Sequence, residues 1–295
     1  MARSATWIAA TCELPAAGED TGSASDAPRN ATTAGSSQVA AIQVALRAKH
    51  LYSGTVDGVL GPSTKAAIVA LQRRAGLVPD GAVGQRTIAA LGPLAAPALG
   101  TRPLALGAVG GDVVELQFLL AWHGFPNGTI DGGFGPHVEA ALLRFQRWAN
   151  LPTVGVAGPA TVAALQAPVP ACPIALAWPL RVVVGDRFGP RGAAFHPGID
   201  LPAATGTPVH AAAVGRVTFA RPTTSGYGNL VVVQHAGGVK TMYAHLSRIL
   251  AYRGESVTVG TLVGLVGATG EATGPHLHFE VRVRGAAVDP LPALG

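Results

Sequence analysis

The sequence contains two copies of one segment, 39–91 and 113–165, related by a constant offset of 74 residues without a gap. The matched positions are mostly glutamine, glycine, aspartate and threonine. They pair Gln43 with Gln117, Gly54 with Gly128, Asp57-Gly58 with Asp131-Gly132, Gly61-Pro62 with Gly135-Pro136, Gln72-Arg73 with Gln146-Arg147, and Thr87 with Thr161. A repeat of this length predicts a small domain that has been duplicated.

Each copy predicts three helices. An amphipathic stretch precedes an Asp-Gly turn, and Gly-Pro then opens a second helix, because proline fits the first helical position. A third, short helix ends at Leu91 or Leu165. We therefore place repeat 1 at 38–92 and repeat 2 at 112–166.

The segments outside the repeats have a different composition. Residues 93–111 are rich in Pro, Gly and Ala, and 167–179 contain four prolines, so we expect two linkers. Residues 1–37 have few large apolar side chains, which predicts a disordered leader without a convincing export signal. The only two cysteines, Cys12 and Cys172, could pair in an oxidising compartment, but two residues establish nothing by themselves.

Composition narrows the class of protein. With 295 residues, 48% hydrophobic and 13% charged, the chain can form two or three domains with real cores. The net charge of +5 comes without a basic block or interleaved aromatic residues, so we expect no nucleic-acid partner. No apolar run reaches the roughly 18 residues of a membrane span, so we expect no stable membrane insertion. We also expect the protein to be a monomer.

Beyond Leu180 the helical period disappears. Valine-rich runs separated by glycine turns predict a mostly antiparallel β domain over 180–295. The fold class is therefore multidomain α + β, with two small three-helix domains followed by the β domain.

One strand of that domain, 276–283, carries two histidines. Its alternation predicts a buried face of Leu, Phe and Val and a wet face of His276, His278, Glu280 and Arg282. The two imidazoles would stand roughly 7 Å apart on one face. A glycine-rich loop, 267–275, precedes them and would let a ligand approach closely.

The segment His196-Pro-Gly-Ile-Asp200 must turn, because proline and glycine exclude a helix there. The turn can present one imidazole and one carboxylate to a common point. An imidazole from 276–278 would complete two nitrogens and one oxygen, the set that leaves catalytic zinc an open position. His210 and His235 have no potential metal-binding residues in a comparable pattern beside them, and we expect both to be ordinary residues of the sheet.

Three segments of the β domain together resemble the signatures of the lysostaphin-type (LytM-type) zinc endopeptidases, which cut peptides of bacterial peptidoglycan. They are His196-x-x-x-Asp200, 243–247 and 274–280. The resemblance implies that His196, Asp200 and His278 bind zinc and that His245 and His276 are catalytic. It also suggests Tyr227 as a transition-state contact, although a turn tyrosine is more often a packing residue.

The duplicated segments resemble the three-helix peptidoglycan-binding repeat, which implies that they bind the cell wall. Repeat 2 departs from the pattern at Val138 and Val154, where repeat 1 has Thr64 and Asp80. Position by position, most of the matched residues are expected to be turn and core residues.

No H-E-x-x-H segment is present, so a histidine must take the part of the glutamate base in that class of protease. Which of His245 and His276 accepts the proton stays open. We expect an extracellular or cell-wall zinc endopeptidase that cuts cross-links or stem peptides of peptidoglycan. A non-catalytic wall-binding regulator and a D-alanyl carboxypeptidase are the alternatives.

Overall fold

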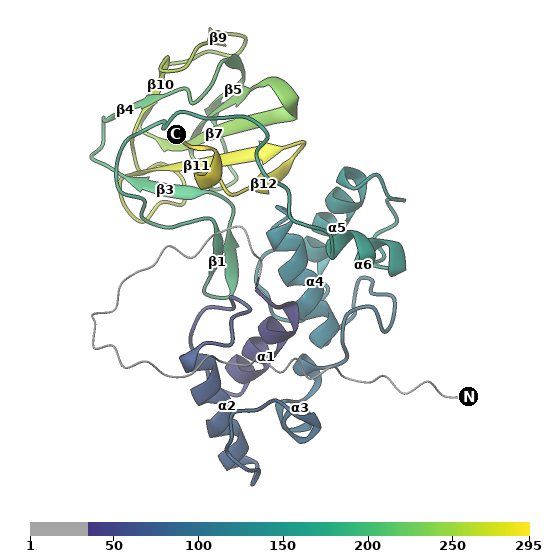
Figure 1. Ribbon diagram of the computed structural model, residues 1–295. Helices are drawn as coiled ribbons and strands as arrows, with labels where there is room; N and C mark the ends of the chain where they lie inside the picture. Colours follow the sequence, from purple (N-terminus) through teal and green to yellow (C-terminus); the bar gives the residue numbers. More distant parts are fainter. Residues whose placement is uncertain (1–34) are drawn as a thin grey trace. The chain divides into compact units, whose positions relative to one another are not determined.

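A computed structural model of the chain describes residues 35–295 (Figure 1). Residues 1–34 of the predicted leader, and Cys12 within them, lie outside the described residues. Six α-helices come first: α1 (Ser37–Ala48), α2 (Pro62–Arg74), α3 (Gln85–Leu91), α4 (Gly111–Trp122), α5 (Pro136–Trp148) and α6 (Pro159–Leu165). The two predicted three-helix repeats are confirmed.

Buried glutamines hold the turns of both repeats. In repeat 1, Gln43 donates to Asp57 Oδ1 at 2.7 Å and accepts from the amide of Gly58 at 2.9 Å. In repeat 2, Gln117 makes the same two bonds to Asp131 and Gly132. The repeated glutamine and Asp-Gly positions are therefore structural.

The two departures of repeat 2 are absorbed locally. Thr64 donates to the carbonyl of Val59, whereas Val138 is 2% exposed and packs in the core of repeat 2. Gln72 donates to Asp80 and to the carbonyl of Ala82 in repeat 1, and Gln146 keeps the second of these bonds, to the carbonyl of Val156 at 2.9 Å. Neither change disrupts the three-helix fold.

The β domain is almost entirely antiparallel, as predicted. Its strands are β1 (Gly189–Arg191), β2 (Ala194–His196), β3 (Ile199–Pro202), β4 (Pro208–His210), β5 (Gly215–Pro222), β6 (Asn229–Gln234), β7 (Val239–Leu246), β8 (Arg248–Ile249), β9 (Ser256–Val257), β10 (Leu262–Leu265), β11 (His276–Val283) and β12 (Ala286–Val288). Short 3-10 turns occupy Pro93–Ala95, Ala236–Gly238 and Leu291–Ala293.

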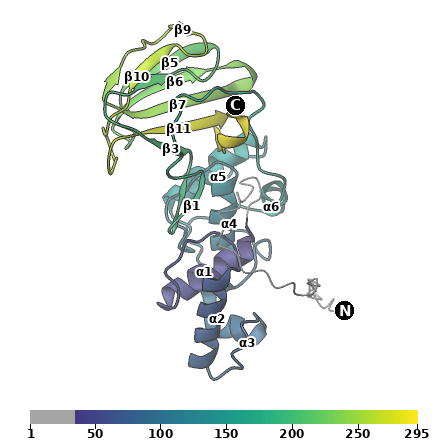
Figure 2. The same cartoon turned by 60° about the vertical axis from the view of Figure 1, so that its left-hand side comes forward.

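The main sheet has the order β12-β11-β7-β6-β5-β9, and β3 also pairs with β11. Figure 2 shows the central strands β11, β7, β6 and β5 of this order. Its core packs around Tyr243, Phe279 and Leu277, all fully buried. A second sheet, β4-β10-β8, covers part of this core. Strand β11 therefore lies between β3 and β7, where two neighbouring strands can bring side chains to its histidines.

The predicted wet face of 276–283 is wrong at its centre. His278 is 6% exposed and Glu280 is 0% exposed. The alternation itself holds, but Tyr227 and Arg282 cover Glu280 on the polar side. The sheet therefore contains a buried polar layer beside its apolar core.

Residues of the two linker segments pack against the domains. Leu104 is fully buried in the core of repeat 2, and Leu176 bridges to Leu294 within the β domain. Cys172 is half-buried, and its thiol donates to the carbonyl of Ile174. Among residues 35–295, no helix combines the length and apolar character that crossing a membrane would require.

Candidate active site

Strand pairing places the first two site residues together. In the antiparallel register of β3 and β11, Asp200 is directly opposite His278. Asp200 Oδ1 lies 2.8 Å from His278 Nδ1. The hairpin of β1 and β2 ends at His196, whose Nε2 lies 3.2 Å from the same carboxylate oxygen.

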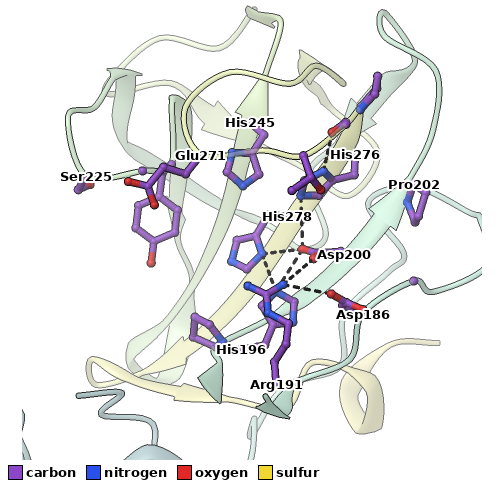
Figure 3. Close-up of a pocket in the computed structure, with 17 residues that line it drawn as sticks. Asp186, Arg191, His196, Asp200, Pro202, Ser225, His245, Glu271, His276 and His278 are labelled. Atoms are coloured by element: carbon purple, nitrogen blue, oxygen red, sulfur yellow. Dashed lines mark hydrogen bonds and ion pairs between the residues drawn. The ribbon is translucent and has the colours of Figure 1, made fainter. Parts of the chain in front are cut away.

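His196, Asp200 and His278 form one triangle of donor atoms. The remaining side, His196 Nε2 to His278 Nδ1, is 3.0 Å (Figure 3). Tetrahedral bonds of 2.0–2.1 Å to zinc imply donor separations of about 3.3 Å, close to these values. Two ring nitrogens and a carboxylate oxygen that face one another require a proton or a cation between them. The group therefore fits a metal ion.

Hydrogen bonds fix the ring tautomers of this group. His196 Nδ1 lies 2.9 Å from the carbonyl of Arg187, to which it can only donate, so Nε2 is left as an acceptor. His278 Nε2 lies 3.0 Å from Glu280 Oε1, which leaves Nδ1 facing Asp200. A carboxylate behind a ligating histidine orients the ring and increases its basicity.

The charges around the triangle are mutually coupled. Burial would raise the pKa of Asp200, but hydrogen bonds from His196 and His278 lower it below its usual range. Burial would lower the pKa of His278, but hydrogen bonds to Asp200 and Glu280 raise it to about 9. Both shifts favour positive charge between the donor atoms of the triangle, which is what a bound metal ion would supply.

His245 and His276 complete the histidine cluster. Their ring centroids are 4.8 Å apart, and both line the same cavity of about 740 Å³ as the donor triangle. His245 Nδ1 faces the carbonyl of Thr269 and His276 Nδ1 faces that of Gly274, each at 2.8 Å. Both rings therefore keep Nε2 as the acceptor.

These two histidines differ in their relation to Asp200. His276 Nε2 lies 3.6 Å from Asp200 Oδ1, farther than either member of the donor triangle. Burial lowers the pKa of His245, so its ring is neutral at neutral pH and can accept a proton. The five residues expected from the sequence are thus all brought to one cavity.

Three other residues support the site and were missed or misjudged from sequence. Glu280 accepts from Tyr227 at 2.7 Å and from Arg282 Nε at 2.8 Å, and the Tyr227 hydroxyl accepts from Arg282. Burial and the Glu280 charge raise the pKa of Tyr227. Its hydroxyl proton is committed to Glu280, which favours the packing role over contact with a transition state.

The remaining histidines of the β domain lie elsewhere. His235 is buried between the carbonyl of Val214 and the hydroxyl of Thr241, and His210 lies on β4. Neither residue lines the histidine cavity.

Comparison with known families agrees with this arrangement. The peptidase family M23 model matches residues 194–290, which include all five site residues. The chain contains a peptidase family M23 domain. The model described as a putative peptidoglycan binding domain matches 35–91 and 109–165, which correspond to the two repeats ahead of the M23 domain.

The most similar proteins share the M23 domain. It is 50% identical over 96 residues to DD-carboxypeptidase/endopeptidase Mpg of Neisseria meningitidis serogroup B, covering 32% of this chain and 22% of that protein. It is 44% identical over 98 residues to peptidoglycan DD-endopeptidase ShyA of Vibrio cholerae, covering 33% of this chain and 23% of that protein. The match therefore spans less than a quarter of either relative.

A solved structure shows a similar local match. The catalytic domain of the antimicrobial peptidase lysostaphin from Staphylococcus simulans is 33% identical, with a TM-score of 0.35, covering 37% of this chain and 90% of that one.

Proposed function

We propose that the protein is a zinc-dependent endopeptidase that hydrolyses peptide bonds in the cross-links or stem peptides of bacterial peptidoglycan. The observation that carries this proposal is the triangle of His196, Asp200 and His278 beside two further histidines, His245 and His276, in one cavity. The peptidoglycan-binding domains and the names of the two relatives support the same substrate. The place of action would be the cell wall, outside the cytoplasm.

His196, Asp200 and His278 would hold the metal ion. When bound, zinc would lower the pKa of a water molecule to about 7 and polarise the scissile carbonyl. The chain offers no carboxylate base of the H-E-x-x-H kind. The proton must therefore move through a histidine.

His245 and His276 are placed for that transfer. His245 Nε2 can accept the water proton, because burial lowers the pKa of the ring and keeps it neutral at neutral pH, and its Nδ1 proton is committed to Thr269. His245 can then return this proton from Nε2 to the leaving amine, and His276 stands next to it with its own Nε2 free to accept a hydrogen bond from the same water. The cavity has a size typical of sites that enclose a small peptide.

Digestion of purified sacculi tests the proposal. Mass analysis should show cross-linked fragments converted to monomers, and the conversion should be abolished by a chelator and restored by zinc. Release of single terminal amino acids alone would establish a carboxypeptidase instead. Wall binding without any product would favour the non-catalytic regulator.

A further inference from the structure

The two repeats share a fold but have opposite charge. Repeat 1 (38–92) has six basic and two acidic residues, a net charge of +4, whereas repeat 2 (112–166) has two basic and four acidic residues, a net charge of −2. Both acidic residues of repeat 1 are engaged in turns, Asp57 with Gln43 and Asp80 with Gln72. The basic side chains of repeat 1 are therefore largely uncompensated.

Two of the six basic side chains of repeat 1, Lys49 and Arg74, line a pocket at the ends of α1 and α2, together with His50. The pocket has a volume of about 430 Å³ and is lined by Ala48, Lys49, His50, Leu71, Arg74, Ala75 and Ala90. We call it the helix-end pocket. Its basic residues make no ion pair with any acidic residue of 35–295.

The negative ends of the helix dipoles do not neutralise the positive charge of Lys49 and Arg74. The C-terminus of a helix carries roughly half a negative charge, so α1 and α2 together supply about one. Lys49 and Arg74 supply two full positive charges. The helix-end pocket therefore keeps a net positive charge and is suited to an anion.

The equivalent pocket of repeat 2 is filled. Residues 74 positions later replace three of its lining residues by rings: His123 for Lys49, Phe145 for Leu71 and Trp148 for Arg74. Phe145 and Trp148 stack with centroids 6.1 Å apart, and His123 Nε2 bonds to the carbonyl of Leu165. No basic side chain of the kind found in repeat 1 remains there.

The same end of repeat 2 contacts the M23 domain. Gly124, the counterpart of His50, accepts from the amide of Ala287 at 3.1 Å, and Trp148 Nε1 donates to the carbonyl of Val283. A Cβ atom on Gly124 would collide with the backbone of Ala287. This end of repeat 2 is therefore occupied by protein.

We propose that repeat 1 alone binds the wall, through the helix-end pocket, and that its ligand is the free carboxylate of a peptide with small apolar side chains. Lys49 and Arg74 would bind the carboxylate, while Leu71 and Ala90 would contact a side chain the size of a methyl group. Repeat 2 instead acts as a mount for the M23 domain. This inference rests on the proposed wall substrate and names the site that recognises it.

Cosedimentation of the full chain with purified sacculi tests the pocket, in a His245→Ala background that leaves the wall undigested. The double variant Lys49→Ala/Arg74→Ala should lower affinity about tenfold or more, because each charge-assisted hydrogen bond contributes roughly a factor of ten. The matched control is Lys65→Ala/Arg86→Ala, which removes the same charge from exposed positions of repeat 1 outside the pocket. The control should change affinity less than about twofold.

Ala48→Trp supplies a second test, because Ala48 lines the pocket and a large ring there would take up pocket volume without changing charge. It should weaken binding as strongly as the double variant. An equal loss in both charge-removal pairs, or full binding by Ala48→Trp, would overturn the pocket as the binding site.

Competition identifies the ligand group. A soluble peptide that ends in D-alanine with a free carboxylate should displace the protein from sacculi, and the same peptide as its C-terminal amide should not. Equal displacement by both would overturn the carboxylate assignment. The active protein is assayed separately on soluble cross-linked peptide. If it does not cleave this peptide but its binding to sacculi still depends on the helix-end pocket, the proposed endopeptidase activity is refuted and the proposed binding site is not.

Discussion

The four histidines of the cavity differ in where their free ring nitrogens point. Those of His196 and His278 approach Asp200 Oδ1 at 3.2 and 2.8 Å, whereas the nearest nitrogen of His276 stops at 3.6 Å. His245 makes no ion pair with that carboxylate in the described part of the chain. The geometry therefore separates the two histidines that we propose to hold the metal ion, His196 and His278, from the two that we propose to act on the substrate, His245 and His276.

Alanine substitutions should separate these two classes. His278→Ala removes one of three protein donors, so zinc content and activity should fall together. His245→Ala should retain zinc but lose activity on the order of 100-fold or more, because a positioned acid-base group contributes about that much. Metal analysis of the purified variants, beside peptide-cleavage rates, makes the distinction.

His276→Ala is the internal control, since it lies on the same strand two residues from His278. It should keep zinc as His245→Ala does. Loss of zinc from His276→Ala with retention in His278→Ala would reverse the two assignments.

Glu280 should act on zinc affinity without touching the metal. Its carboxylate accepts from His278 Nε2 and is itself held by Arg282 and Tyr227. Glu280→Gln keeps the size but removes the charge, so the zinc dissociation constant should rise about 10- to 100-fold. Chelator competition measures it, with Glu271→Gln, an exposed carboxylate of the same cavity, as the control. Unchanged affinity in Glu280→Gln would limit Glu280 to a packing role.

The sequence predicted the site residues that occur in short patterns. It did not predict the contacts between residues that are far apart in the chain. His196 and Asp200 are four apart with a turn between them, and resemblance supplied the rest. Glu280 was expected in solvent, because alternation shows which side a residue faces but not what covers that side. The covering residue Tyr227 is 53 positions away, so no local pattern could reveal the contact.

Strand β7 shows a similar limit at the scale of an element. Tyr243 and Leu246 both pack in the main core although they are three residues apart, which breaks strict alternation. The break occurs at His245, whose φ is +59°, a rare conformation for a residue other than glycine. It turns the imidazole into the cavity. The strand was predictable from its valine and tyrosine content, but this rotation was not.

Helix α4 ends at a buried histidine that should make stability depend on pH. Burial lowers the pKa of His123 from its usual 6.5, although the bond to Leu165 opposes the shift. Below pH 6.5 the unfolded chain therefore binds more protons at His123 than the folded chain does. The contribution of neutral, buried His123 to the free energy of unfolding is complete above pH 6.5 and is lost as the pH falls. The melting temperature should decrease between pH 7 and 5.

His123→Gln should flatten that decrease, since glutamine can still donate to Leu165 and does not titrate. His137→Gln is the matched control, because His137 is exposed in the same repeat. An unchanged pH dependence in His123→Gln would mean that other groups cause the acid destabilisation.

At the scale of the molecule, the order and fold of the domains followed from the duplication and from the loss of helical period after 180. The unequal roles that we propose for the repeats did not. The matched glutamines and Asp-Gly turns make the copies look equivalent, because those residues build the fold. The difference lies at the unmatched pairs His50/Gly124 and Arg74/Trp148, whose meaning depends on what each helix end contacts.

The distribution of charge predicts how the whole chain responds to salt. Repeat 1 carries +4, and residues 180–295 carry ten basic and six acidic residues, again +4. Screening shortens from about 10 Å at 0.1 M salt to about 3 Å at 1 M, which weakens attraction to an anionic wall polymer. Activity on intact sacculi should therefore fall with salt more steeply than activity on a small neutral peptide. Lys49→Ala/Arg74→Ala should reduce that difference, since part of it arises at the helix-end pocket. Parallel salt curves for sacculi and peptide would show that the charge has no part in wall recognition.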